Sequence, residues 1–529
     1  MVANRGEIAI RIFRTCERLG IETVAVVAPD DRGSFHAREA ARTVEISSYL
    51  EATEYVRAAM EAEADAIHPG YGFLSENAAF ADLVLESGTI WVGPPPEALS
   101  LGGDKLAAKR IALKAGVPTL PQGAPEEIGY PLVVKAAAGG GGRGMRIVRS
   151  PEELDDALAA ARREAEAAFG NGTVFCERYL ERPRHVEAQI IGDENGVILL
   201  GQRDCSIQRR HQKVIEESPA PGLHPLAWPA VAAGAVAFAE AIGYRSAGTA
   251  EFLVDGPDVY FLELNGRIQV EHPVTEQVTG LDIVELQLRV ASGETLDLDV
   301  APQGHAIEAR LYAENPRSFL PQTGRIERLV FPTGVRVDSG VEEGDEVGTS
   351  YDPMIAKLIA HGSDRDDVID QLAGALAETV VEGVTTNLPF LRWLVHHPAF
   401  RAGDVSTAFL LEHPPLSAAP LRSPPRAFAR PWRLNLPVPP PAASPDVDSE
   451  LPGVEAGARH GTIVAPMPGT VIRVEIAPGD IVTARQPLVV LEAMKMEMPV
   501  AAPFPATVTA VLVGPGDQVA AGAPLVELD

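Results

Sequence analysis

Apolar and polar positions follow two different periods along the first 100 residues. Residues 7–19 repeat apolar side chains at helical spacing, whereas 23–27, 66–70 and 90–94 are short apolar runs that lead into loops and predict strands. Strands alternating with helices favour a doubly wound α/β domain. Val2 and Ala3 resemble the end of a first strand, so we expect translation to start a few residues upstream.

The pattern changes after residue 130. Two apolar runs within 131–148 flank a stretch of glycines, and an Ala/Glu/Arg-rich segment at 152–168 predicts a helix. Mixed α+β patterning continues to about residue 411. Residues 414–458 are rich in Pro, Ala and Ser, which predicts a semi-rigid linker rather than a packed domain.

Residues 460–529 contain two near-copies of one β-rich unit. Each copy has short apolar strands broken by a Pro-Gly-Asp turn, at 478–480 and 515–517. Because one copy is too small to bury its apolar face alone, we expect the two to pack with pseudo-twofold symmetry. Lys495 lies between the copies on the predicted joining hairpin, where a lysine is exposed and suited to modification. An ordinary turn lysine is the alternative.

The composition indicates a soluble multidomain enzyme. The 529 residues carry a net charge of −28, which argues against nucleic acid or an anionic membrane as a partner. Three widely spaced cysteines form neither a zinc motif nor a disulfide framework and suit a reducing cytoplasm. The sequence has no apolar run of 18 residues and no signal-peptide pattern.

The segment around Lys495 is similar to that of biotin carrier domains. It reads Ala493-Met494-Lys495-Met496, and residues 460–529 resemble that family throughout. Lipoyl domains, the alternative, usually flank their lysine with acidic and small residues. Arg485 and Ala506 stand where carrier domains usually have glycine, so a positive-φ backbone would cost some strain there.

Two features upstream point to phosphate and metal chemistry. Lys135 precedes a glycine run at 139–142 that is not a Walker A loop and resembles the mobile lid of ATP-grasp enzymes. Glu251 and Glu263 lie 12 residues apart on two predicted strands, with Asn265 two residues further on the same face. Such oxygen ligands suit Mg²⁺ bound to nucleotide phosphates, although solvated glutamates at the edge of the core are the alternative.

Two dense polar segments, 203–213 and 265–276, complete the resemblance to biotin carboxylase. It covers nearly all of residues 2–412 and includes the motifs at 68–76 and 351–357. The resemblance implies nucleotide contacts, a metal site, a bicarbonate site, a base for bicarbonate and an arginine for the biotin enolate. The corresponding residues are Lys105, Lys135, Gly141, Gly142, Glu177, Leu180, His185, Gln208 and His211 for the nucleotide; Glu251, Glu263 and Asn265 for the metal; Lys213, Arg267, Gln269 and Val270 for bicarbonate; Glu271 for the base; and Arg310 for the enolate.

The resemblance implies an enzyme that carboxylates biotin on Lys495 with ATP, bicarbonate and Mg²⁺ (or Mn²⁺). Catalytic roles fall on Glu271, Arg267, Arg310 and Lys213. No segment is suited to a carboxyltransferase barrel, so we expect a separate carboxyltransferase β subunit, together with a biotin protein ligase and a homo-oligomer formed through the carboxylase domain. The short linker favours acetyl- or propionyl-CoA as the acceptor. Methylcrotonyl-CoA, a longer acyl-CoA, or a non-enzymatic carrier with an inactive ATP-grasp domain are alternatives.

The expected fold is multidomain α/β and α+β. Predicted boundaries are 1–104 for the doubly wound domain, 105–295 for the ATP-grasp domain with a lid at about 120–182, 296–412 for the biotin carboxylase C-terminal domain, 413–459 for the linker and 460–529 for an all-β biotinyl domain, a flattened barrel. The segment before the lid, residues 118–130, is about a dozen residues shorter than in relatives. We therefore expect altered hinge geometry there.

Overall fold

A computed structural model describes residues 1–136, 145–169, 172–209, 212–416, 461–483, 486–493, 496–520 and 522–529. The predictions for Gly141, Gly142, His211, Arg485, Lys495 and most of the linker lie outside the described residues. Within the described part of the chain, no helix is long and apolar enough to cross a membrane.

The N-terminal residues form the predicted α/β unit. Its helices are α1 (Gly6–Arg18), α2 (Phe35–Glu39), α3 (Ala52–Glu61), α4 (Ala78–Glu86) and α5 (Pro96–Gly103), with the 3₁₀ turn η1 (Pro29–Asp31), and its strands are β1 (Val24–Val27), β2 (Arg42–Glu45), β3 (Ala66–Ile67) and β4 (Ile90–Trp91). The pairs β1–β2 and β3–β4 are parallel, and Val2 bridges Ala25 and His68 in parallel fashion. Val2 therefore joins the two strand pairs, as its apolar run predicts.

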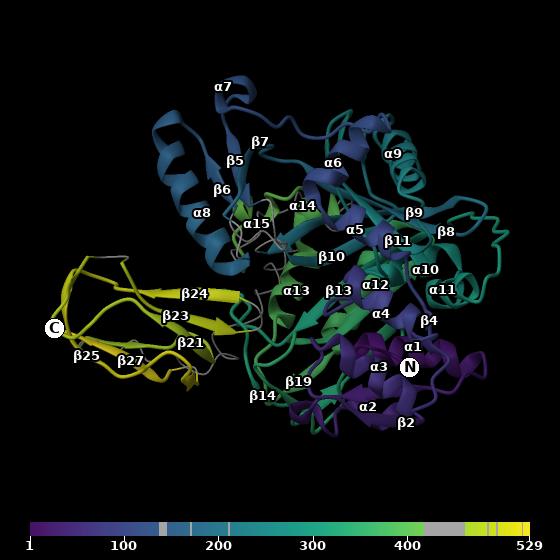
Figure 1. Cartoon of the computed structure of the whole chain (residues 1–529). Helices are drawn as coiled ribbons and strands as arrows, with labels where there is room; N and C mark the ends of the chain where they lie inside the picture. The colour runs from purple at the N-terminus through teal and green to yellow at the C-terminus, as the bar shows by residue number, and fades with distance from the viewer. Residues whose placement is uncertain are drawn as a thin grey trace, which may run out of the picture.

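A small three-stranded sheet projects from the main body beside α8 (Figure 1). Its order is β6-β5-β7, from β5 (Leu132–Ala136), β6 (Arg146–Val148) and β7 (Val174–Arg178). The turn η2 (Pro151–Glu153) leads into α8 (Leu154–Phe169), and Leu132, Val134, Val148 and Ala161 form a buried apolar cluster beneath that helix. The predicted two strands and following helix are confirmed. Helices α6 (Lys105–Lys114) and α7 (Pro125–Ile128) precede this sheet.

One eight-stranded sheet runs through the centre of the molecule in the order β12-β11-β8-β9-β10-β13-β18-β16. Its strands are β8 (Arg184–Gly192), β9 (Val197–Arg209), β10 (Gln212–Ser218), β11 (Ser246–Asp255), β12 (Asp258–Asn265), β13 (His305–Tyr312), β16 (Arg336–Ser339) and β18 (Met354–Gly362). Because β10 pairs with β13, the sheet is continuous across residue 295, where a boundary was predicted.

Helices pack on this sheet, and the same part of the chain forms two small antiparallel sheets. The helices are α9 (Ala227–Ala241), α10 (His272–Thr279), α11 (Ile283–Ala291), α12 (Arg365–Glu378), α13 (Leu388–His396), α14 (Pro398–Arg401) and α15 (Phe409–Glu412), and the short strands are β14 (Gly324–Arg325), β15 (Arg328–Val330), β17 (Glu346–Val347) and β19 (Val380–Glu382). Helix α10 packs against β10, β13 and β18. This contact sets the residues that precede α10 over the middle of the sheet.

The C-terminal residues form two four-stranded sheets, drawn in yellow in Figure 1. Their orders are β20-β27-β25-β22 and β24-β23-β21-β26, from β20 (Gly461–Val464), β21 (Gly469–Val474), β22 (Ile481–Val482), β23 (Pro487–Ala493), β24 (Met496–Ala501), β25 (Ala506–Val511), β26 (Gln518–Val519) and β27 (Pro524–Leu528). Each copy lends one short strand to the other copy, since β22 pairs with β25 and β26 with β21. Through these strand pairs the two repeats pack on each other, as the sequence predicts.

Ala506 does not show the backbone strain that was expected where carrier domains usually have glycine. It begins β25 opposite Val482 and is not among the described residues with positive φ. The expected backbone strain is therefore absent at this position.

Candidate active site

Glu271 lies at the centre of a buried cluster of charges, directly before α10. Lys213 donates from Nζ to Glu271 Oε1 at 2.6 Å, and Arg310 donates from Nη2 to Glu271 Oε2 at 2.8 Å. Burial alone would raise the pKa of Glu271, but the two cations hold it below its usual value. Glu271 is therefore ionised at neutral pH, with each oxygen facing a cation.

Lys213 links Glu271 to two more carboxylates. Its ammonium contacts Glu187, which is fully buried, and donates to Glu251 Oε1 at 2.8 Å. Burial opposes the charge of Lys213, yet the surrounding carboxylates raise its pKa well above the usual value. A permanent cation is thus fixed between the predicted base and the predicted metal residues.

The predicted metal residues meet across two paired strands. Glu251 on β11 lies directly opposite Glu263 on β12, and Asn265 is opposite Thr249. Asn265 donates from Nδ2 to Glu251 Oε1 at 2.9 Å. Burial and the charge of Glu251 raise the pKa of Glu263. Two adjacent carboxylates that resist joint ionisation suit a divalent cation with oxygen ligands, so the residues fit Mg²⁺.

We expect Glu263→Gln to weaken the handling of Mg·ATP rather than the proton chemistry. Losing one charged ligand should raise KM for Mg·ATP by about tenfold, which corresponds to a loss of about 1.4 kcal/mol of binding free energy. Steady-state ATP cleavage over a range of Mg²⁺ concentrations measures this effect. Asp258→Asn, an exposed change at the start of the same strand, is the matched control. An unchanged Mg²⁺ dependence in Glu263→Gln would contradict the metal assignment.

Predicted nucleotide residues reach the same cluster through His185. Gln208 Nε2 lies 2.7 Å from His185 Nδ1, and His185 Nε2 lies 2.9 Å from Glu251 Oε2. Burial opposes the charged imidazole, but Glu251 raises the pKa of His185 above its ordinary value. The structure thus connects residues predicted to contact the nucleotide with residues predicted to hold its metal.

The predicted bicarbonate residues lie in the loop that enters α10. Gln269 donates from Nε2 to Glu251 Oε1 at 2.8 Å, and the Val270 carbonyl accepts from Lys357 Nζ at 2.8 Å. Arg267 donates from Nη2 to Asn265 Oδ1 at 2.9 Å and forms an ion pair with Glu76 at 3.1 Å. These bonds hold the loop beside Lys213 and Glu271.

Three charged side chains form an ion triad at the predicted adenine end of the nucleotide site. Glu177 on β7 is fully buried and contacts both Lys109 on α6 and Lys135 on β5, the latter at 2.5 Å. Leu180 follows two residues after β7, and Lys105 is the first residue of α6. Lys109 was missed by the sequence reasoning because a lysine in an amphipathic helix normally faces solvent.

Three further residues of the cluster were not assigned roles from the sequence. Arg203 is fully buried and donates to Glu187, Gln189, Thr249, Gln269 and Thr275. Arg203 and Lys357 belong to motifs that the sequence singled out, so their positions carried a signal. Glu187 gave no such signal in the sequence, because a single glutamate in a strand normally lies at a solvent-exposed edge of the sheet.

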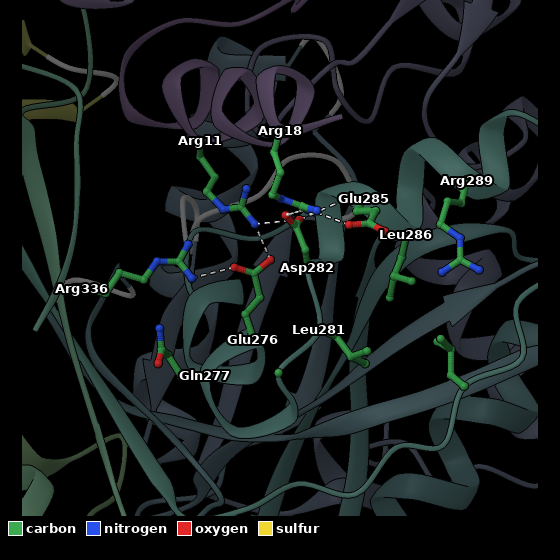
Figure 2. A pocket seen from close by; sticks show the side chains of 12 residues that line it. Arg11, Arg18, Glu276, Gln277, Leu281, Asp282, Glu285, Leu286, Arg289 and Arg336 are labelled. Atoms are coloured by element: carbon green, nitrogen blue, oxygen red, sulfur yellow. Dashed lines mark hydrogen bonds and ion pairs between the residues drawn. The ribbon is translucent and has the colours of Figure 1, made fainter. Parts of the chain in front are cut away.

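A pocket of about 530 Å³ lies outside this cluster and contains none of the predicted site residues. Figure 2 shows Arg11 and Arg18 of α1 facing Glu276, Asp282 and Glu285. Arg11 donates to Glu276 at 2.6 Å and to Asp282 at 2.9 Å. We interpret these bonds as ties between α1 and the α10–α11 segment rather than as a reaction site.

The attachment hairpin is described up to the residues that flank its tip. β23 ends at Ala493 and β24 begins at Met496, and these two residues are paired. The predicted joining hairpin is therefore present, while Lys495 itself lies outside the described residues.

Four protein families match the chain in succession. Their descriptions are "Biotin carboxylase, N-terminal domain" for 1–99, "Carbamoyl-phosphate synthase L chain, ATP binding domain" for 118–299, "Biotin carboxylase C-terminal domain" for 308–412 and "Biotin-requiring enzyme" for 461–528. The predicted sequence of domain types is confirmed by these matches.

Curated relatives agree with these families. The biotin carboxylase of Halalkalibacterium halodurans is 46% identical and covers 78% of this chain and 97% of its own length. The mitochondrial methylcrotonoyl-CoA carboxylase subunit alpha of Oryza sativa is 50% identical over 78% of this chain and 59% of its own length. This chain thus spans about three fifths of that relative.

Solved structures support the same fold. One is the complex of Campylobacter jejuni biotin carboxylase with β,γ-ATP, which has a TM-score of 0.76 and 42% sequence identity. The match covers 78% of this chain and 98% of that chain. The biotin carboxylase domain dimer of Hydrogenobacter thermophilus 2-oxoglutarate carboxylase, with MgADP, ADP and bicarbonate, has a TM-score of 0.76 and 43% identity, covering 78% and 97%. Taken together with the cluster around Glu271, these matches show that the chain belongs to the biotin carboxylase family of ATP-dependent ligases and carries a C-terminal domain of the biotin-requiring class.

Proposed function

We propose that this chain carboxylates biotin attached to its own Lys495, using Mg·ATP and bicarbonate, and delivers the carboxyl group to an acyl-CoA on a separate carboxyltransferase subunit. The observation that carries the proposal is Glu271, buried and ionised between Lys213 and Arg310 and adjacent to the paired carboxylates Glu251 and Glu263. A base, two cations and a metal-type ligand pair occur together there.

The first step assigns proton removal to Glu271. A base with a lowered pKa is weak while both of its oxygens face cations. Bicarbonate bound at Lys213 and Arg267 takes part of the positive charge of Lys213 and raises the basicity of Glu271. The bicarbonate proton then passes to Glu271, and the bicarbonate oxygen attacks the γ-phosphorus of ATP, which releases ADP and forms carboxyphosphate.

The second step assigns charge stabilisation to Arg310. Carboxyphosphate breaks down to CO₂ and phosphate. Attached biotin would supply the nitrogen nucleophile: its ureido nitrogen would give its proton to the phosphate and bond to the carbon of CO₂. Arg310 offers its guanidinium to the oxygen on which negative charge develops, and Lys213 stays beside the phosphate leaving group. Closure of the predicted lid at about 120–182 excludes water from the reactive intermediate.

Several acyl-CoAs are candidates for the final acceptor of the carboxyl group. The short linker favours acetyl- or propionyl-CoA, whereas two plant relatives named methylcrotonoyl-CoA carboxylase subunit alpha are 50% and 48% identical to this chain. Both acceptor classes enter the test below.

We expect the purified biotinylated chain to label its own biotin but no acyl-CoA. Labelled bicarbonate, Mg·ATP and acetyl-, propionyl- and methylcrotonyl-CoA are supplied with and without a candidate carboxyltransferase. Label should reach the chain in both cases and an acyl-CoA only with the partner. The 45-residue segment 414–458 gives the carrier a reach of tens of Å, about 5–6 Å × √n for a flexible tether. Labelled acyl-CoA made by the chain alone would contradict the division between two subunits.

Two further partners and a cellular location belong to the proposal. A biotin protein ligase loads Lys495, and a second copy of the chain associates through the carboxylase domain, as supported by the dimer named for the Hydrogenobacter thermophilus structure. We also propose a cytoplasmic location, which is supported by three buried cysteines that are all free thiols.

A further inference from the structure

Two buried carboxyl groups that the proposed reaction does not use lie beside Arg310. Glu216 on β10 and Glu308 on β13 are both fully buried, and they are directly opposite each other in antiparallel register. The Cβ atoms of such opposed residues lie about 4.5–5.5 Å apart. Two acidic groups are thus crowded together away from water.

Both residues share one face of the sheet with Arg310. Glu308 and Arg310 are two residues apart on β13, and Lys357 on β18 lies opposite Arg310. Ala306 and Ile359 on the same face pack against Val274 and Val278 of α10. The carboxyl pair therefore lies on β10 and β13 under α10, the helix that follows Glu271; Figure 1 shows these two strands in the main body.

The pair has few cationic partners. Glu216 Oε1 forms an ion pair with Arg310 Nη2 at 2.5 Å. Among the described residues, no hydrogen-bond partner meets either oxygen of Glu308. Lys357 directs its ammonium to the Val270 carbonyl at 2.8 Å and to Glu7 at 3.1 Å instead. Glu308 consequently lacks a cation of its own.

The surrounding groups restrict how much charge the pair holds. Facing it are Arg310 from β13, Lys213 from β10, Lys357 from β18, the Cys205 thiol from β9, and Glu271 directly before α10. Burial raises the pKa of Glu216 to about 7. Burial, opposed by Lys357 and reinforced by Glu216, raises the pKa of Glu308 well above its usual value. Two adjacent buried carboxyls do not both ionise when one lacks a counter-charge.

We propose that Glu216 and Glu308 together hold one proton, which resides on Glu308, and that the Glu216 carboxylate is a positioning residue that fixes Arg310 beside Glu271. The inference rests on the role proposed above for Arg310. Nη2 of Arg310 contacts Glu216 at 2.5 Å and Glu271 at 2.8 Å, so Glu216 anchors the same guanidinium nitrogen that faces the base. A neutral Glu308 avoids a second anion that would compete with the substrate for the charge of Arg310.

The test compares Glu216→Gln with Glu308→Gln in the full-length chain, with free biotin as acceptor. Glu216→Gln removes the anchor and should lower kcat for biotin carboxylation by about 10²-fold, the typical cost of a misplaced group. KM for Mg·ATP should stay unchanged. The kcat of the wild type should show an inflection near pH 7, where Glu216 titrates, and this inflection should be absent in Glu216→Gln. Glu308→Gln copies the protonated acid, so its kcat and pH profile should match those of the wild type.

Stability gives a second, independent readout. The raised pKa of Glu216 means that its contribution to stability is lost as pH rises through about 7. Replacing it by glutamine removes that loss, so the Tm of Glu216→Gln relative to the wild type should increase between about pH 5 and about pH 8. Glu217→Gln is the matched control, because this buried neighbour on β10 pairs with His305 and Arg365 on the other face. Its Tm should fall, while the pH profile of kcat stays the same.

Three outcomes would overturn the inference: a retained inflection in Glu216→Gln, full activity in Glu216→Gln, or an equal loss of kcat in Glu308→Gln. Arg310→Gln separates this inference from the proposal beneath it. Full activity in Arg310→Gln would refute the role of Arg310 itself. An inactive Arg310→Gln beside a fully active Glu216→Gln would refute only the positioning pair.

Discussion

Lys495→Arg should abolish biotin attachment and, with it, every transfer of label to the chain. Lys495 is the only lysine in residues 461–529, so no neighbouring amine within the carrier unit replaces it. Ala493 and Met496 are paired strand ends, and Lys495 lies between them in the sequence, so we expect a ligase to reach the lysine. Arginine keeps the positive charge but offers no primary amine for an amide bond.

Intact mass after treatment with biotin ligase measures the effect. The double variant Lys495→Arg with Arg473→Lys is the matched control, since it restores the lysine count on an exposed part of β21. We expect no biotin on either variant, because the ligase requires the lysine at the hairpin tip. Biotin on the single variant would show that the attachment site lies elsewhere, and biotin on the double variant would show that position is unimportant.

Glu271→Gln should lower bicarbonate-dependent ATP cleavage by ~10²–10⁴-fold, the usual contribution of a positioned base. Nucleotide binding should remain close to that of the wild type, because Glu251, His185 and Gln208 keep their mutual contacts. Phosphate release with and without bicarbonate, together with ATP affinity by calorimetry, measures both effects.

The control for Glu271→Gln is again Glu217→Gln, a buried carboxylate in ion pairs outside the cluster. It should lower stability without removing the bicarbonate dependence. If Glu271→Gln turns over at the wild-type rate, another group removes the proton. If ATP affinity collapses as well, Glu271 has a structural role in the nucleotide site that the contacts of Lys213 would explain.

The amino-acid sequence determined most of the local elements. Helical spacing at 7–19 predicted α1, and the apolar runs around a glycine stretch predicted β5, β6 and the helix α8. The repeat after residue 460 predicted two interlocked halves, since neither half buries its apolar face alone. Local periodicity and turn residues carry this information, so it is readable without the fold.

The sequence also pointed to the residues of the candidate site, through their resemblance to biotin carboxylase. Arg203, Lys213, Arg267 and Glu271 lie in the two dense polar segments, and the structure brings these segments together. Lys109 and Glu187 lay in ordinary amphipathic patterns and were not recognised. Their contacts with Glu177 and Lys213 depend on elements far away in the chain, which no local pattern encodes.

Only the tertiary structure decided which charges face each other. Lys213 and Arg310 reach Glu271 from 58 and 39 residues away because β10 and β13 pair beneath α10. The same register sets Glu216 against Glu308 and removes both from water, which decides their protonation. A sequence gives the number and type of ionisable groups. Their pKa values follow from burial and from the distances between charges, and both of these are fixed by non-local strand pairing.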